Sequence, residues 1–521
     1  MDVKKTTTST GFKLSVMTLA IMNVTAVVSL RGLPAEAVYG LSSAFYYLFA
    51  AIVFLIPTAM VAAELAAMFA DKQGGVFRWV GEAYGARTGF LAIWLQWIES
   101  TIWYPTVLTF GAVSIAFIGM NDTHDALLAS NKVFTLCMVL AIYWIATLIA
   151  LKGLGWVGKI SKWGGMIGTI IPAGLLIVLG VIYISTGGHN HMDMSQGFFP
   201  DLSKFNNLVL ASSIFLFYAG MEMMGIHVMD VKNPSRNYPK AIIIGSLVTV
   251  LIFILGTFSL GLIIPAKDIS LTQSLLVGFD NYFHYLHISW AGPIIAIALM
   301  FGVLAGVLTW VAGPSKGIFA VGKAGYLPPF FQKTNKNGVQ KNILLIQGCV
   351  VTLLALLMVI LTYGMETTFF RFVNKETENS ERVYSTVLFM VGSTSLIFAA
   401  LCMLFLHPVA GMMGYGDHPW YIGMMALVIA MDAFQCIPFA YLRYKKRPIR
   451  FAALKLLFIL LNITLNLVYY VVMKGSDVFY AFFFNLICTS VIMVLMVPYL
   501  KFNGGFDKPL AKRMLIYSYP I

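Results

Sequence analysis

FYAGMEMMGIHVMDVKNPSRNYP, residues 217–239, is an apolar segment with Gly220, Glu222 and Gly225 near its middle. An uninterrupted membrane helix avoids such residues, because a break in the helix leaves backbone N–H and C=O groups without partners. These groups are tolerated in a bilayer only where they line a cavity or are buried in protein. The stretch therefore predicts a helix that is broken at membrane depth for a functional reason.

AVVSLRGLPAEA, residues 26–37, shows the same kind of interruption, with Arg31, Gly32 and Pro34 at membrane depth. The two interrupted segments are the first and the sixth apolar segments, which is the spacing that an inverted repeat of five helices requires. In such a pair, the N-terminal ends of half-helices favour a carboxylate and the carbonyl ends favour a cation or an amine. A zwitterionic amino acid fits this polarity.

The composition places the chain in a lipid bilayer. Of its 521 residues, 59% are hydrophobic and 11% are charged, whereas about 25% of the residues in an average soluble domain are charged. Uncharged apolar runs of about 20 residues recur, and this is the length of a membrane-spanning helix. We expect an all-α polytopic membrane protein with about thirteen spans, which excludes a large soluble core.

The lysines and arginines indicate topology rather than a nucleic-acid partner. The net charge is +13, but the basic residues lie mainly in short loops between the apolar runs, as the positive-inside rule describes. With the basic N-terminus taken as cytoplasmic, the loops alternate consistently up to residue 342. We therefore expect a multi-pass protein of a bacterial inner membrane with a cytoplasmic N-terminus.

The loops near the C-terminus predict a conflicting orientation. RYKKRPIR, residues 443–450, and LKFNGGFDKPLAKR, residues 500–513, are strongly basic and are expected in the cytoplasm. Counting back from them puts the charged stretch at residues 363–385 in the cytoplasm, whereas counting from the N-terminus puts it outside. Either a re-entrant segment near residues 343–370 absorbs the difference, or parts of two proteins meet here.

Several stretches before residue 362 resemble the amino acid, polyamine and organocation superfamily, and within it the bacterial glutamate/γ-aminobutyrate antiporters. They are AAELAAMFADKQGGVFRWVGEAYG, FFPDLSKFNNLVL, GMEMMGIHVMDVKNPSRNYPKA and GVLAGVLTWVAGPSKG followed by NKNGV. The resemblance covers residues 1–362. It implies secondary amino acid antiport by an inverted-repeat core of nine helices, with the first and sixth broken and the tenth absent.

The resemblance and the two interruptions together define the candidate substrate-binding residues. By resemblance, Glu222 and Trp310 line the substrate path. An ionisable group inside a membrane is a functional candidate because its burial is costly, although Glu222 could also be a structural acid. Gly306 stands where the antiporters have a second acid and Val28 where they have a tyrosine, which leaves the identity of the substrate open. The full candidate set is Ser29, Arg31, Gly32, Gly220, Glu222 and Trp310.

Two further charged residues are candidates for coupling transport to an ion. Glu99, in WLQWIESTIWYP, could pair with Arg31 inside the membrane. Arg31 itself could be an anchor or the partner of a substrate carboxylate. Lys162 resembles a lysine that replaces a sodium ion in some proton-coupled relatives, and it could equally be an orienting charge. Glu64, near a helix end, is expected at the membrane interface.

The chain after residue 362 resembles a different family. YGMETTFFRFVNKETENSERVYSTVLFM, AFQCIPFAYLRYKKRPIRFAALKLLFILLNITLNL and FDKPLAKRMLIYSYPI are similar to a polysaccharide or lipopolysaccharide biosynthesis flippase of the multidrug/oligosaccharidyl-lipid/polysaccharide superfamily. The resemblance predicts a permease portion at residues 1–362 fused to a truncated flippase portion of about four helices at residues 363–521. The alternative functions are a polysaccharide-lipid flippase fragment and an inactive fusion of the two.

No enzymatic or metal site is expected. GLGWVGK, residues 153–159, fits a dinucleotide-binding pattern but follows a membrane helix instead of a strand, and HNH, residues 189–191, offers too few ligands for a closed metal site. The sequence shows no pairing of a nucleophile with a base, so we expect no cofactor. The expected partners are an amino acid and the bilayer, with the oligomeric state open. The cysteines lie in apolar segments without disulfide or zinc spacing: Cys137, Cys349, Cys402, Cys436 and Cys488.

Overall fold

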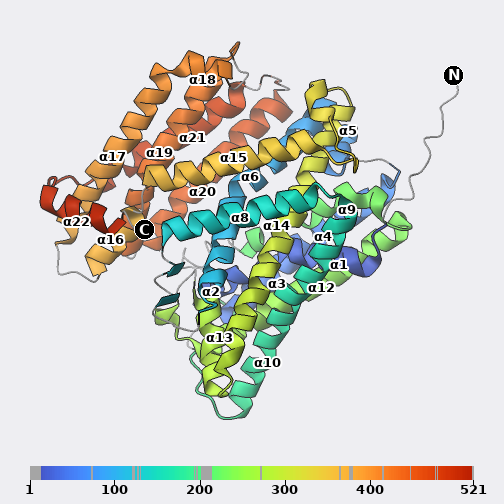
Figure 1. Cartoon of the computed structure of the whole chain (residues 1–521), viewed down its shortest axis with the longest axis horizontal. Coiled ribbons are helices and arrows are strands. Elements are labelled where there is room, and N and C mark those ends of the chain that lie inside the picture. The colour runs from blue at the N-terminus through green and yellow to red at the C-terminus, as the bar shows by residue number, and fades with distance from the viewer. Residues whose placement is uncertain are drawn as a thin grey trace. The chain divides into compact units, whose positions relative to one another are not determined.

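The computed structural model consists of helices joined by loops (Figure 1). Within the residues that it describes, the one isolated β interaction is a parallel bridge between Leu14 and Val231, so this part of the chain is all-α, as the composition predicts. The described residues are 13–71, 74–119, 124–125, 128–129, 131–192, 194, 197–200, 214–269, 273–362, 365–374, 379–412, 416–445, 447–473, 475, 477 and 479–518.

The chain divides into two compact units, Met1–Leu354 and Ala355–Ile521, here called unit 1 and unit 2. Most of the motif FFPDLSKFNNLVL, residues 198–210, lies outside the described residues. The helices that begin in unit 1 are α1 (Val16–Val27), η1 (Leu30–Gly32), α2 (Leu33–Ala37), α3 (Ser42–Ala50), η2 (Ala51–Leu55), α4 (Ile56–Met68), α5 (Val76–Tyr84), α6 (Ala86–Ala116), α8 (Lys132–Ala150), α9 (Leu154–Gly165), η3 (Met166–Ile170), α10 (Ile171–Ser185), η4 (Met221–Asp230), α12 (Pro234–Ile263), η5 (Ala266–Asp268), α13 (Ser274–Tyr285), η6 (Ser289–Ala291), α14 (Gly292–Lys323), η7 (Pro329–Gln332) and α15 (Lys341–Thr362).

The first and the sixth segments are both interrupted, as the sequence predicts. In the first segment, α1 ends at Val27, and Val28 and Ser29 adopt extended backbone conformations before η1 begins. In the sixth, Gly220 has a φ of 113°, in the left-handed region that glycine adopts without strain, and the 3₁₀-helix η4 follows it. Residues of the sixth segment before Ile214 are outside the described part of the chain.

Glycines allow α9 and η3 to pack closely on α14. A Cβ atom added to Gly168 would lie 2.1 Å from the backbone nitrogen of Gly302, and one added to Gly164 would lie 2.8 Å from the Cβ of Ala305. Small residues at such crossings let helix backbones approach in a membrane, where packing rather than a hydrophobic driving force holds helices together. The glycines therefore fix the position of α14, which carries Trp310.

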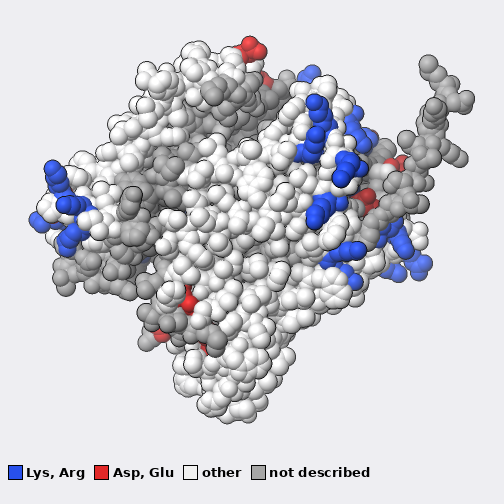
Figure 2. All heavy atoms as spheres, viewed as in Figure 1, with Lys and Arg blue, Asp and Glu red and all other residues white. Residues whose placement is uncertain are grey.

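The basic loops of unit 1 gather at one end of that unit. The side chain of Asn335 donates a hydrogen bond to the carbonyl of Leu151 at 2.6 Å, which joins the loop after α14 to the loop after α8. The rings of Phe77 and Tyr326 lie 6.5 Å apart and bring α5 to the same end. Figure 2 shows basic side chains of this unit gathered where α5 and α9 lie. This grouping agrees with the loop alternation read from the sequence.

Unit 2 is built on four long helices, α17, α19, α20 and α21. Its main core joins α16, the start of α17, the end of α19 and α22, where the rings of Tyr384 and Tyr441 stack 3.9 Å apart and Phe369 is fully buried. The elements are α16 (Met365–Asn374), α17 (Ser380–Leu404), α18 (Leu406–Met412), α19 (Pro419–Tyr444), α20 (Pro448–Leu467), η8 (Val468–Val472), α21 (Phe479–Met496), η9 (Val497–Tyr499) and α22 (Lys508–Ser518).

Ten helices among the described residues are long and apolar enough to cross a membrane. The sequence predicts about thirteen, and the three further runs correspond to α6, the broken sixth segment and α15. The helix α6 contains Arg87 and Glu99, and the sixth segment is not one continuous helix. In α15, the apolar part whose side chains are described, Lys341–Leu356, is shorter than the 18 residues required of a span. The total of thirteen is therefore not confirmed.

The helix α15 contains no re-entrant turn. It runs without interruption from Lys341 to Thr362, and its 22 residues span about 33 Å at 1.5 Å per residue. The re-entrant segment that the sequence suggested near residues 343–370 stays a prediction, because that range extends past α15 to residues 363–364, which lie outside the described part of the chain.

Within unit 2, the charged stretch lies at the same end as both basic loops. The guanidinium of Arg443 lies 5.6 Å from the ring centre of Phe370 on α16, and the Ser385 hydroxyl donates to the carbonyl of Gly505 at 2.7 Å. Figure 2 also shows basic side chains of this unit gathered near α22. This arrangement agrees with the count from the C-terminus, which predicts all three segments on one side of the membrane.

Single cysteines at the start of α17 and in the segment between α18 and α19 test the orientation of unit 2. We expect an impermeant maleimide to label Gly416→Cys in intact cells and to leave Ser380→Cys unlabelled, because the basic end of the unit should face the cytoplasm. The background has the five native cysteines replaced by alanine. Labelling of both sites after permeabilisation is the control, and labelling of Ser380→Cys alone in intact cells would reverse the orientation.

Candidate functional site

Trp310 on α14 caps the broken end of α1. Its ring N–H donates a hydrogen bond to the carbonyl of Ala26 at 2.9 Å, and the side chain is 9% exposed. In an uninterrupted helix that carbonyl would accept from the backbone N–H of residue 30, but Val28 and Ser29 are extended. Trp310 therefore supplies a partner for a backbone group that the break leaves without its helical one.

Two glycines place aromatic rings against the broken segments. A Cβ atom added to Gly220 would lie 2.9 Å from the ring of Trp310, and one added to Gly32 would lie 2.7 Å from the ring of Phe217. Trp310 thus contacts both broken segments, and Phe217 of the sixth segment lies directly against the first. The predicted residues Gly32, Gly220 and Trp310 are brought together in this way.

One face of α6 runs along the two broken segments. The amide nitrogen of Gln96 lies 3.3 Å from a carboxylate oxygen of Glu222, and the ring centres of Trp103 and Trp310 are 5.7 Å apart. Further along the same face, the carbonyl of Thr106 accepts a hydrogen bond from Arg31 at 3.2 Å. The residues at 96, 99, 103 and 106 follow helical spacing, so Glu99 lies on this face too.

Arg31 and Glu99 do not pair with each other. Within the described part of the chain, Arg31 bonds to Thr106 and no ion pair links it to Glu99, so that suggested pairing is wrong for this structure. Glu99 instead lies one helical turn from Gln96, which donates a hydrogen bond to Glu222. The site therefore brings one acid onto the face of α6 and another against it, while the guanidinium of Arg31 contacts the α6 backbone.

Two positions that depart from the antiporter pattern pack against the first segment. A Cβ atom added to Gly306 would lie 3.2 Å from the carbonyl of Thr25, so α14 approaches α1 closely at this position. Val28 is buried within the break itself. A larger side chain at either position would need room that the present packing does not provide. Ser29, the neighbour of Val28, is partly exposed.

Lys162 lies beside the site rather than within its set of contacts. Its ammonium lies 5.4 Å from the ring centre of Trp163. The preceding residue, Ser161, is fully buried and accepts a hydrogen bond from Thr309 of α14 at 2.9 Å. The described contacts do not bring Lys162 to the broken segments, and its coupling role stays a prediction.

A buried polar chain supports α6 from its other side. The ring N–H of Trp97 donates to the amide oxygen of Gln347 at 2.9 Å, and the Gln347 amide nitrogen donates to the hydroxyl of Tyr104 at 3.0 Å. Gln347 and Tyr104 are fully buried. Because unmade hydrogen bonds are expensive in a membrane interior, this chain fixes the rotation of α6 and hence the direction of its Glu99 face.

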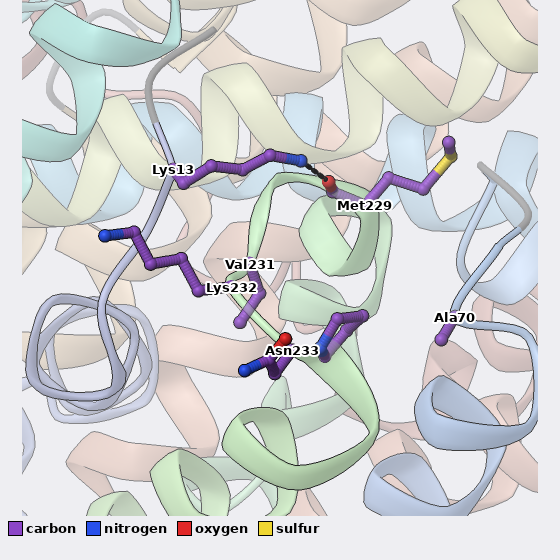
Figure 3. Close-up of a pocket in the computed structure, with 7 residues that line it drawn as sticks. Lys13, Ala70, Met229, Val231, Lys232 and Asn233 are labelled. Atoms are coloured by element: carbon purple, nitrogen blue, oxygen red, sulfur yellow. Dashed lines mark hydrogen bonds between the residues drawn. The ribbon is translucent and has the colours of Figure 1, made fainter. Parts of the chain in front are cut away.

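The broken segments are joined again at the end of unit 1 where its basic loops gather. Leu14 forms the parallel bridge with Val231, Lys13 donates to the carbonyl of Met229 at 2.6 Å, and Lys316 of α14 forms an ion pair with Asp230. A cavity of about 460 Å³ lies beside these contacts, and Figure 3 shows Lys13 reaching across it to Met229. It is lined by Lys13, Ala70, Met229, Val231, Lys232, Asn233 and Pro234.

The structure adds residues that the sequence did not single out. Gln96, Trp103 and Phe217 all contact the predicted set. Gln96 and Trp103 could have been found from their spacing of three and four residues from Glu99, whereas nothing in the sequence indicates that Phe217 covers Gly32. No group of three or more potential metal ligands occurs among the described residues.

Comparisons with known proteins all point to transporters. The sequence model of the amino acid permease family matches residues 14–499. An uncharacterized transporter of Legionella pneumophila is 37% identical over 348 residues, which are 67% of this chain and 74% of that protein. A glutamate/gamma-aminobutyrate antiporter of Lactococcus lactis is 32% identical over 356 residues, 68% and 69% of the two chains. The permease match continues well past residue 362, and no comparison supports a flippase segment.

Replacing Trp310 with phenylalanine tests whether it caps α1. The change keeps an aromatic ring against Gly220 but removes the N–H that reaches Ala26, and an unpaired buried carbonyl costs about 1–3 kcal/mol. We expect Trp310→Phe to lower the thermal unfolding midpoint of the purified protein in detergent.

Trp290→Phe is the matched control, because the Trp290 side chain is 65% exposed and should tolerate the change. Equal midpoints for Trp310→Phe and Trp290→Phe would show that the Ala26 carbonyl does not depend on Trp310.

Proposed function

This chain belongs to the amino acid permease family, and on that basis we propose that it is a secondary amino acid antiporter of the glutamate/γ-aminobutyrate type. The family consists of multi-pass membrane transporters, so an amino acid substrate and a bilayer follow from membership. The observation that carries the finer proposal is the contact of Trp310 with both broken segments beside Glu222.

The site can bind both ends of a zwitterion. The break after α1 presents the N-terminal end of the continuous helical segment formed by η1 and α2, which favours a substrate carboxylate. Arg31 lies there as well, and a guanidinium has five N–H donors, of which one contact uses Nη1. Glu222, at the start of η4, supplies negative charge for the amine. Ser29 is partly exposed beside the break, whereas Gly32 and Gly220 lie under the rings of Phe217 and Trp310, so a substrate would reach the backbone there only after those rings move.

Exchange also requires the contacts at the basic end to separate. The Leu14–Val231 bridge and the Lys316–Asp230 ion pair hold the first segment, the sixth segment and α14 together there. Alternating access moves one group of helices against another around a fixed central site. In our proposal this end faces the cytoplasm of a bacterial cell, these contacts close the cytoplasmic path, and Lys162 remains a candidate for coupling.

We retain a flippase-type origin for residues 363–521 as a second hypothesis. The division between Leu354 and Ala355 lies close to the resemblance boundary, and the relatives described above align with about two thirds of this chain. The observation against it is the permease match through residue 499. Translocation of a lipid-linked sugar would favour this second function, and amino acid counterflow favours the first.

Counterflow in proteoliposomes tests the antiporter directly. We expect unlabelled internal γ-aminobutyrate or glutamate to stimulate uptake of the same radiolabelled compound several-fold, because an exchanger returns loaded far more readily than empty. Liposomes without protein are the control. The antiporter proposal fails if none of the twenty standard amino acids, nor γ-aminobutyrate, stimulates uptake at acidic or neutral pH.

Glu222→Gln tests the role of the membrane carboxylate. The change keeps the size of the side chain and removes its charge, so we expect the exchange rate to fall about tenfold or more and its dependence on pH to change. Counterflow measured across a range of pH provides both readouts.

Glu64→Gln serves as the matched control, because Glu64 is exposed on α4 and outside the site. If Glu222→Gln exchanges at the wild-type rate with the wild-type pH profile, Glu222 has a structural role and not a role in transport.

A further inference from the structure

Glu99 lies on the face of α6 whose other polar and aromatic residues bind the broken segments and Trp310. Gln96 donates a hydrogen bond to Glu222, and the ring of Trp103 packs against that of Trp310. The carbonyl of Thr106 accepts a hydrogen bond from Arg31. Glu99 lies between them on the same face and is exposed. Within the described residues its carboxylate has no hydrogen bond and no ion pair, so it is available to a ligand.

The hydrogen-bonding groups around Glu99 are mostly acceptors. Glu222 accepts from Gln96, and the orientation of that amide leaves its oxygen buried without a donor. The guanidinium of Arg31, the cation of the candidate set that reaches this face, is directed to the Thr106 carbonyl. A ligand that fits here must therefore bring N–H donors and positive charge, because unmatched buried acceptors are costly.

The indole ring of Trp103, one helical turn from Glu99, adds to this preference. Trp103 follows Glu99 by one helical turn, and its ring centre lies 5.7 Å from that of Trp310. The face of an indole ring attracts an ammonium group, and the attraction is strongest when the site excludes water. A carboxylate, an unpaired amide oxygen and an indole ring together form the surroundings that an ammonium group prefers.

We infer that Glu99 determines specificity by binding an ammonium group at the distal end of the substrate. The site then favours an ω-amino acid, or an amino acid with a terminal amine, over a dicarboxylate, whose distal charge Glu99 repels. This inference rests on the proposed amino acid transport and adds to it the chemical class of the substrate's side chain. Glu222 has a different role from Glu99, because its carboxylate already accepts a hydrogen bond from Gln96.

Competitive binding to the purified full chain tests the inference without requiring transport. The measurement is displacement of radiolabelled γ-aminobutyrate by ornithine, norvaline and glutamate, which share an α-amino acid head and end in an ammonium, a methyl and a carboxylate. We expect wild type to bind them in that order of decreasing strength. Glu99→Gln should weaken γ-aminobutyrate and ornithine about tenfold or more and leave norvaline unchanged.

Two further variants separate charge from structure. Glu99→Asp keeps the carboxylate and should retain the order of the three competitors, and Glu64→Gln, an exposed acid of α4, should leave all affinities within about twofold of wild type. If Glu99→Gln does not fold, the wild-type order alone decides. Glutamate binding at least as well as ornithine, or no binding of γ-aminobutyrate, overturns the inference.

The outcomes also distinguish this inference from the proposed function. A protein that binds with the expected order and Glu99 dependence but shows no counterflow is not an antiporter, and the assignment of Glu99 stands. A protein that exchanges amino acids with the same competitor order in wild type and Glu99→Gln is an antiporter in which Glu99 does not determine specificity.

Discussion

A helix broken inside a bilayer persists only if protein groups replace the backbone partners that it loses, because the hydrocarbon region offers no water. The hydrogen bond from the Trp310 ring to the Ala26 carbonyl meets this requirement at the end of α1. The same ring lies against Gly220, where the sixth segment turns through a left-handed conformation. One side chain of α14 thus stabilises both interruptions, and the remaining elements of the site are positioned around it.

The helix α6 connects the residues around Trp310 to the buried polar chain through Gln347. Its inner face carries Gln96, Glu99 and Trp103 toward the broken segments, and its opposite side is held by the buried chain that runs through Gln347. Rotation of α6 would break both sets of contacts at once, so the face of the helix on which Glu99 lies is well determined. The specificity that we assign to Glu99 depends on this double attachment as much as on the residue itself.

The core of unit 2 bears on the orientation that the loop charges leave open. The stack of Tyr384 on Tyr441 and the burial of Phe369 bring the charged stretch to the same end as the two basic loops. That grouping satisfies the count from the C-terminus. The helix α15 runs unbroken from Lys341 to Thr362, so a re-entrant turn near residues 343–370 would have to lie after Thr362. The origin of unit 2 is a separate question. The permease match through residue 499 favours a permease origin, whereas the relatives' alignment with only about two thirds of this chain favours a different one.

Local sequence determined the features that depend on composition and spacing: the helical class, the two interruptions, the basic loops of each unit and the candidate residues Glu222 and Trp310. These follow from hydrophobicity and from helix-breaking residues, whose effects act within a few positions along the chain. The tertiary structure alone decided which residues meet across helices. It separated Arg31 from Glu99, joined Gln96 to Glu222 and placed Phe217 over Gly32. Such contacts depend on the rotation and depth of each helix, which packing against its neighbours sets and which periodicity within one segment does not specify.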